Sequence, residues 1–257
     1  MIALTRRWSL PLLLLALFFV AWEIAVRLSD TPAWMLPRPS AIWEAFRDNQ
    51  ALLWRHTRVT LLEVLFGFGV ALTAGVTIGI AIDSSITLER ALYPLIIASQ
   101  TIPMVVLAPL LLIWFGYGLT PKIIVAALIA FFPIAVSTVD GLRAADREMM
   151  AMLRSLGASR WTRFRMAKLP AALPSIFSGA RIGIAVSVIA AVFGELVGAS
   201  EGLGYLMQRD SSQFLTARVF ASIFILSLMG VGLFGLIGVL ERLLLPWRRY
   251  VTDRPNG

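Results

Sequence analysis

Six long stretches of apolar residues, separated by shorter polar segments, dominate the sequence. They cover residues 10–26, 59–82, 92–115, 122–139, 178–198 and 221–244. A helix needs about 20 residues to cross the roughly 30 Å hydrocarbon core of a bilayer, and most of these stretches reach that length. Apolar and polar residues do not alternate within them, as they would in barrel strands. The pattern predicts an all-α polytopic membrane protein, a single transmembrane domain over residues 1–257 with six spanning helices.

The composition supports a membrane location for these stretches. Of the 257 residues, 58% are hydrophobic and 15% are charged, and the mean hydropathy is +0.81. Typical soluble domains are about 45–50% apolar and about 25% charged. The pair Arg6-Arg7 before the first apolar run also fits a signal peptide. Bulky side chains fill that run and no small-residue cleavage site follows it, so we favour an uncleaved first helix.

The basic residues are shared unevenly between the two sides of the predicted spans. With the N-terminus in the cytoplasm, the inner segments hold 15 of the 23 lysines and arginines. Cytoplasmic loops of membrane proteins are enriched in these residues. Both termini are therefore predicted to be cytoplasmic, and the net charge of +8 is explained without a nucleic-acid partner.

The first outer loop, residues 28–57, is predicted to carry a helix at the membrane surface. Ser40 follows three prolines and is a suitable N-cap for an amphipathic stretch that runs to about Trp54. Trp43 and Phe46 on this stretch are typical of a helix that lies in the interface. His56, which follows it, is interpreted as an interfacial residue.

Prolines and glycines modify several of the predicted spans. Three prolines in residues 92–115 predict a kink or an interruption of the third span. Gln100 lies in that region, where its amide would meet a solute or satisfy freed backbone carbonyls. Glycines spaced four apart, and four glycines crowded into residues 230–238, predict close packing between helices.

The longest polar stretch, residues 140–175, lies between the fourth and fifth spans on the cytoplasmic side. It predicts a helix over 148–156 that ends at Gly157, a favourable residue after a helix C-terminus. Ser159 would cap a second helix that continues to Leu169, where Pro170 stops it. We call this helix–turn–helix the elbow. One of its faces is basic and the other apolar, which suits docking into a groove of a partner.

The elbow resembles the cytoplasmic "EAA" loop of permease subunits in binding-protein-dependent ABC importers. Gly157 and the pair Leu169-Pro170 match the family pattern at the right spacing. Residues 151–153 are Ala-Met-Leu where Glu-Ala-Ala is expected, and Ala167 replaces Ile. Glu148, almost one turn earlier, is the candidate replacement for the missing glutamate.

The resemblance extends from about residue 92 to residue 247. The stretches QTIPMVVLAPLLLIWFGYGLTPK, FFPIAVSTVDGLR and LPAALPSIFSGAR are similar to the nitrate, sulfonate and taurine branch of the family. GELVGA and LERLLLPW are closer to its relatives for thiamine-pyrimidine precursors and riboflavin. The solute is therefore expected to be a thiamine-type pyrimidine or related heterocycle, with sulfonate, taurine or nitrate as the alternative.

The resemblance implies a type I ABC importer permease in the bacterial inner membrane. Two copies would form the path, a periplasmic or lipid-anchored binding protein would deliver the solute, and two cytoplasmic ATPase subunits would each receive the elbow as a coupling helix. The residues that would couple to the ATPase are Glu148, Leu156, Gly157, Ala158, Ser159, Arg160, Trp161, Leu169 and Pro170.

The sequence offers no catalytic chemistry of its own. A nucleotide-binding P-loop needs Gly-Lys followed by Ser or Thr, and neither Lys122 nor Lys168 has that context. With no cysteine and one histidine, neither a metal site nor another bound cofactor is predicted. Residues 198–202, GASEG, match a nucleophile elbow, but they follow a membrane helix where the motif needs a strand. The basic elbow also resembles a DNA-binding helix–turn–helix, but it is tethered between membrane spans.

Three polar residues are candidates for the translocation path: Gln100, Glu195 and Glu63. Ionisable groups within membrane helices are functional candidates by default. The alternative for Glu195 is that it reaches interfacial water near the end of its span. A secondary transporter or channel that works without ATP is the alternative function, and it would need such charges for coupling.

Overall fold

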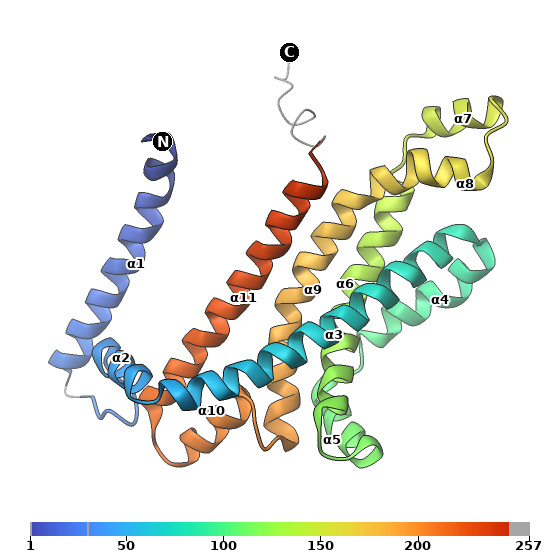
Figure 1. Cartoon of the computed structure of the whole chain (residues 1–257). Helices are drawn as coiled ribbons and strands as arrows, with labels where there is room; N and C mark the ends of the chain where they lie inside the picture. The colour runs from blue at the N-terminus through green and yellow to red at the C-terminus, as the bar shows by residue number, and fades with distance from the viewer. Residues whose placement is uncertain (1, 30, 247–257) are drawn as a thin grey trace. The chain divides into compact units, whose positions relative to one another are not determined.

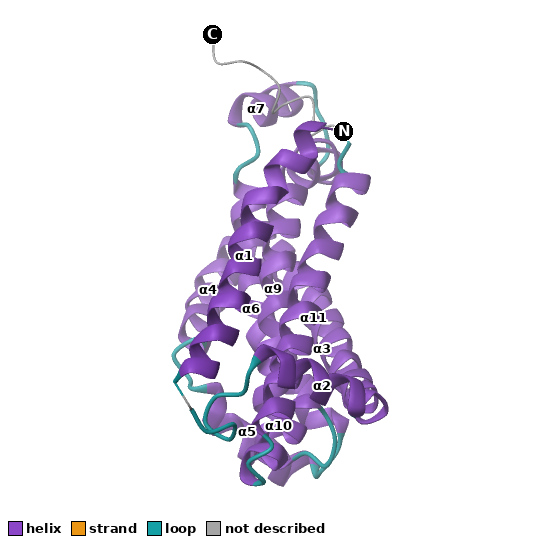
Figure 2. Cartoon of the chain, turned by 90° about the vertical axis from the view of Figure 1, so that its left-hand side faces the viewer, coloured by secondary structure: helices purple, strands orange, loops and turns teal. Residues whose placement is uncertain are grey.

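The computed structural model describes residues 2–29 and 31–246, and all regular elements in these ranges are helices (Figure 2). The chain forms two compact units. The first contains Met1–Val59 with Glu201–Ser227, and the second contains Thr60–Ser200 with Leu228–Gly257. The prediction of an all-α protein is confirmed for the described part of the chain.

The first unit contains α1 (Ile2–Leu28), α2 (Pro39–Asp48), α10 (Leu203–Ser212) and the first turns of α3 (Gln50–Ser84) and α11 (Thr216–Leu244) (Figure 1). The predicted cap Ser40 is wrong, because Arg38 occupies the N-cap position and Pro39 begins the helix. The Ser40 amide and hydroxyl instead donate to the Glu23 carboxylate of α1, at 3.0 and 2.9 Å. A carboxylate from another helix thus satisfies the free amide at the start of α2.

The surface helix is shorter than its amphipathic pattern predicts. It ends at Asp48, where the backbone and side-chain amides of Asn49 donate to the Ala45 carbonyl, at 3.2 and 2.8 Å, and α3 begins at Gln50. Trp54 and His56 therefore belong to the first turns of a long membrane helix. Trp43 and Trp54 are 61% and 63% exposed, as expected of aromatic residues at an interface.

In the second unit, α6 (Leu119–Arg143) and α9 (Leu169–Gly198) share the most extensive contact. Glycines allow this approach: a Cβ at Gly179 would lie 2.7 Å from the Ser137 Cβ and 2.8 Å from the Pro133 carbonyl oxygen. Gly75 and Gly79 of α3 meet α6 in the same way. Close packing is confirmed at these positions. The glycines at positions 230, 232 and 235 of the last span do not show such packing. A Cβ added at any of them would have no atom of the described chain within 4 Å.

The third predicted span is interrupted, as its prolines indicate. It forms α4 (Ile86–Ser99) and α5 (Met104–Phe115), separated by residues 100–103. The hydroxyls of Ser99 and Thr101 donate to the carbonyls of Ile96 and Ala98, each at 2.7 Å. The Gln100 backbone amide also donates there, to the Ile97 carbonyl at 3.1 Å, but the Gln100 side-chain amide makes no hydrogen bond within the described residues.

Five helices among the described residues are long and apolar enough to cross a membrane. They include Ser9–Leu28, Gln50–Ser84, Leu119–Arg143, Arg160–Gly198 and Thr216–Leu244. The third predicted span is not among them, because its two halves are each too short. The count of six spans therefore stays a prediction.

The elbow consists of α7 (Arg147–Ser155), the short α8 (Arg160–Arg163) and a π-helical segment, Phe164–Lys168, at the end of α6 and α9 that lies away from α5 (Figure 1). The prediction that Pro170 stops the second helix is wrong. The π-helical turn, in which the Leu169 amide donates to the Phe164 carbonyl, precedes Pro170 and leads directly into α9. The wider turn accommodates a residue that lacks an amide proton.

Replacing Gly179 by alanine is expected to force α6 and α9 apart and to destabilise the chain by about 1–3 kcal/mol. The close neighbours include a backbone oxygen, which cannot rotate away. Gly235→Ala is the matched control, because its Cβ would meet nothing within 4 Å. Thermal unfolding in detergent should show a lower midpoint for the first variant only. Equal midpoints would contradict the packing account.

Candidate functional site

The first half of the elbow has a helix with both ends capped. The Asp146 carboxylate accepts from the amides of Glu148 and Met149, at 2.8 and 3.4 Å. At the other end, Gly157 has φ +73°, and its amide donates to the Arg154 carbonyl at 3.0 Å. The next amide, of Ala158, donates to the Leu153 carbonyl at 2.9 Å. These two bonds form a Schellman motif, which confirms that the helix ends at Gly157.

The second half begins as the sequence predicts. The Ser159 hydroxyl accepts from the Thr162 amide at 3.1 Å, so Ser159 is the N-cap of α8. Caps on both sides of the turn hold residues 156–159 in one defined conformation. A rigid turn of this kind can present its side chains to a partner without a large ordering cost.

The turn exposes large apolar side chains. Leu156 is 74% exposed, Trp161 is 68% exposed, and Met152 on the preceding helix is 55% exposed. The Trp161 ring stacks on Phe164, with centroids 5.7 Å apart. Exposed apolar groups gathered on one small element indicate an interaction surface.

The structure brings most of the predicted coupling residues together. Residues 156–161 form the turn and the start of α8, and Glu148 is exposed in the first turn of α7. Leu169 and Pro170 are partly buried and lie further along, in the first turn of α9. They belong to the continuous helix and not to the exposed turn.

A buried ionic cluster joins three helices of the second unit near the end opposite the elbow. The Lys122 ammonium of α6 lies 2.7 Å from the Glu63 carboxylate of α3. Glu195 of α9 accepts from the Thr60 hydroxyl at 2.6 Å, and its carboxyl lies beside that of Glu63. Glu63 and Glu195 are 0% exposed and Lys122 is 5% exposed.

These exposures overturn the interpretation that Glu195 reaches interfacial water. Two carboxyl groups and one ammonium share this buried site, and charges removed from solvent are stable only where they have partners. Sequence reasoning identified Glu63 and Glu195 but missed Lys122 as their partner. The one signal in the sequence that pointed to Lys122 was its position, as a lone lysine at the start of an apolar stretch. Gln100 lies apart from this cluster, exposed at the break between α4 and α5.

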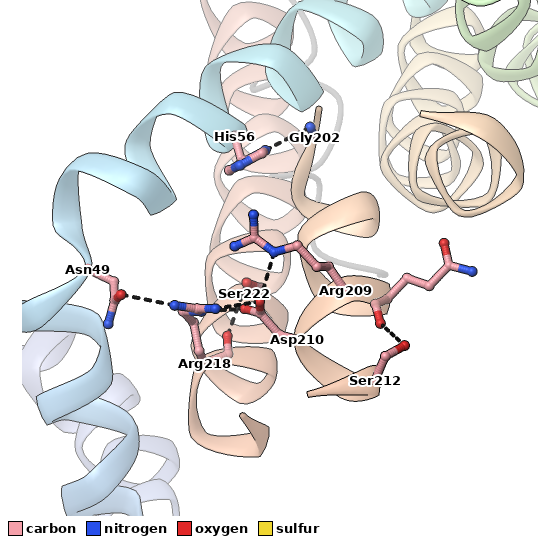
Figure 3. Close-up of polar contacts among 9 residues, drawn as sticks. Asn49, His56, Gly202, Arg209, Asp210, Ser212, Arg218 and Ser222 are labelled. Atoms are coloured by element: carbon pink, nitrogen blue, oxygen red, sulfur yellow. Dashed lines mark hydrogen bonds and ion pairs between the residues drawn. The ribbon is translucent and has the colours of Figure 1, made fainter. Parts of the chain in front are cut away.

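A second polar network lies in the first unit (Figure 3). The Arg218 guanidinium donates to the fully buried Asp210 at 2.6 Å and to the Asn49 side chain at 3.1 Å. Arg218 therefore connects α10 and α11 to the junction of α2 and α3. This arrangement stabilises the unit, because each buried charge has an ionic or hydrogen-bonding partner.

His56 is not an interfacial residue. Its ring is 4% exposed, and Nδ1 accepts from the Gly202 amide at 3.0 Å (Figure 3). Arg55 forms an ion pair with Glu201 beside it. The GASEG segment follows α9, a helix, so the strand that a nucleophile elbow requires is not there. His56 and Arg55 anchor this segment to the start of α3.

The family described as "Binding-protein-dependent transport system inner membrane component" matches residues 71–245. A formylaminopyrimidine transport permease protein from Halalkalibacterium halodurans is 40% identical over 93% of this chain and 96% of its own length. A riboflavin transport system permease protein from Chloroflexus aurantiacus is 42% identical over 93% of this chain and 90% of its own length.

A solved structure has the same fold. A chain of the MetNI methionine ABC transporter, in an inward facing conformation, superposes with a TM-score of 0.64 and covers 77% of this chain and 97% of that chain. The two sequences are 22% identical, so this likeness shows the fold alone.

Lys122→Met is expected to destabilise the second unit by about 3–5 kcal/mol, because it leaves the buried Glu63 carboxylate without its cation. Combining it with Glu63→Gln should restore much of the loss. Arg90→Gln, at an exposed position, is the control. The midpoints of thermal unfolding of these three variants and of the native chain, in detergent, would measure this. A Lys122→Met variant as stable as the native chain would contradict the ion-pair account.

Proposed function

The chain belongs to the family of inner membrane components of binding-protein-dependent transport systems, the permeases of ABC importers, and on this premise we propose that its elbow couples it to an ATPase. In this family the ATPase is a separate subunit, and the permease itself is not an enzyme. The observation that carries the proposal is the rigidly capped turn with Leu156 and Trp161 exposed on it.

The connections of the elbow support its role as a lever. Residues 160–198 form one uninterrupted helical stretch, so a displacement of α8 is carried into α9. Lys168 also binds both carboxylate oxygens of Asp83, at 2.8 and 2.7 Å, which ties the elbow to the end of α3. Closure of the ATPase on ATP would thus shift two membrane helices together and favour one access state over the other.

The charge distribution sets the proposed orientation. With both termini in the cytoplasm, the elbow faces the ATPase subunits, and α2 with α10 faces the side from which a binding protein delivers the solute. One chain supplies half of the path, and we propose a second copy of this chain as the other half. The bacterial inner membrane is the proposed location.

The proposed solute is a thiamine-type pyrimidine or a related heterocycle. The two relatives reported above carry names for a formylaminopyrimidine and for riboflavin, which are both nitrogen heterocycles. A sulfonate, taurine or nitrate is the alternative solute. An ATP-independent transporter is set aside, because the family and these relatives are ABC importer permeases.

Of the three candidate path residues, Gln100 is the one open to a solute. Its side chain is exposed and makes no hydrogen bond within the described residues, whereas Glu63 and Glu195 are sealed in a cluster. We therefore assign Gln100 to the path. Glu63 and Glu195, with Lys122, would instead hold together α3, α6 and α9, which we place along the wall of the path.

Gly157→Val is expected to lower recovery of the ATPase in a pull-down, and ATP-driven uptake, by about tenfold. A β-branched residue is strained at positive φ by about 1–3 kcal/mol, so the turn would rearrange. Nothing lies within 4 Å of a Cβ at this position, so the fold itself should persist. Gly157→Asn is the matched control, because asparagine tolerates this conformation. ATP-driven uptake by Gly157→Val at the level of the native chain would contradict the coupling proposal.

A further inference from the structure

A groove of about 500 Å³ lies in the second unit, between the elbow and the end of α3. Three arginines from the elbow line it, Arg154, Arg160 and Arg163, and Trp161 and Phe164 form an apolar part of its wall. Leu156, the most exposed apolar residue of the turn, does not line it. The groove and the exposed turn are therefore adjacent surfaces of the same elbow, and Arg160 and Trp161 belong to both.

The positive charge of the groove is not balanced within the described chain. Lys168 and Asp83, which also line the groove, neutralise each other through two short hydrogen bonds. The described residues supply no ion pair and no side-chain hydrogen bond for Arg154, Arg160 or Arg163. In addition, the Arg163 Nε is buried without an acceptor. A buried donor in this state is costly, and native structures rarely leave one unsatisfied.

The π-helical segment shapes the wall of the groove. Arg163 immediately precedes the segment, and both its first residue, Phe164, and its last, Lys168, face the groove. π-Helical turns are rare and occur frequently at functional sites, where they reposition side chains. Here Arg163, which has no ionic partner among the described residues, lines the groove together with the stacked rings of Trp161 and Phe164.

We propose that this groove binds a phosphate-class oxyanion, held by Arg154, Arg160 and Arg163. Guanidinium groups bind phosphate oxygens through paired, charge-assisted hydrogen bonds. The source is either the headgroup of an anionic phospholipid or a free phosphate. A lipid fits the position of the groove, because Ile80 and Ser84 at the end of a membrane helix line it and the aromatic wall can take apolar atoms.

The site is tested on the purified full chain in detergent, without the ATPase, so failure here is separate from failure of the coupling proposal. Inorganic phosphate is titrated against thermal unfolding, with chloride at matched ionic strength. Binding of phosphatidylglycerol and of phosphatidylcholine is compared by native mass spectrometry. Arg163→Gln is expected to weaken binding of the anionic probe about tenfold, as loss of a charged hydrogen bond implies.

Arg165→Gln is the matched control. Arg165 is exposed in the same π-helical segment and does not line the groove, so its loss should leave binding unchanged. Arg163→Lys keeps the charge but not the paired donors, so it should bind the anionic probe at an intermediate level. This variant shows whether lost binding in Arg163→Gln comes from the lost guanidinium or from misfolding. Stabilisation by phosphate alone assigns a free anion, and retention of phosphatidylglycerol without a phosphate effect assigns the lipid.

Two results would overturn the proposal. If Arg163→Gln and Arg165→Gln weaken binding of the anionic probe equally, the binding depends on general surface charge and not on the groove. Loss of ATPase recovery in Arg163→Gln, with phosphate and lipid binding unchanged, would assign the groove to an acidic side chain of the ATPase.

Discussion

A single helical stretch, residues 160–198, runs from the elbow through the membrane, and most of the account depends on its continuity. At 1.5 Å per residue it is about 60 Å long. Pro170 and Pro174 lie within it, and either could have broken it. The π-helical turn before Pro170 accommodates the missing amide hydrogen bond, so one continuous helical run joins the exposed turn at one end to the ionic cluster at the other.

Ionic contacts secure this element to its neighbours at three levels. Near the elbow, Lys168 binds Asp83 of α3; further along, Arg181 pairs with Glu241 of α11 at 2.6 Å. Toward the other end, Glu195 joins the pair formed by Glu63 and Lys122. Between these levels the glycines of α9 allow it to lie close against side chains and backbone of α6. In lipid, where apolar side chains gain little from leaving solvent, close packing and buried polar contacts must hold the helices together.

Local features of this chain could be predicted from sequence. The end of a helix at Gly157, the cap at Ser159 and the break in the third span each depend on a few neighbouring residues whose backbone preferences are strong. The all-α class followed from the length of the apolar runs, and the family from motifs along most of the chain.

Features that depend on contacts between distant parts of the chain could not be predicted from the sequence. The cap of α2 comes from Glu23, and His56 holds the amide of Gly202, 146 residues away. The partnership of Lys122 with Glu63 spans 59 residues. Pro170 was predicted to end a helix because proline normally does so. The π-helical turn that lets the helix continue has no simple sequence signature. In each case the partner is set by tertiary packing and not by sequence spacing.

The central claim is that an ATPase subunit docks on the elbow, and site-directed cross-linking tests it most directly. The chain contains no cysteine, so Leu156→Cys introduces its sole thiol. In membranes that also hold the ATPase subunits, a thiol-reactive bifunctional reagent should join this variant to the ATPase. Gln213→Cys, exposed after α10, should not be joined. Cross-linking from residue 213 but not from residue 156 would contradict the account.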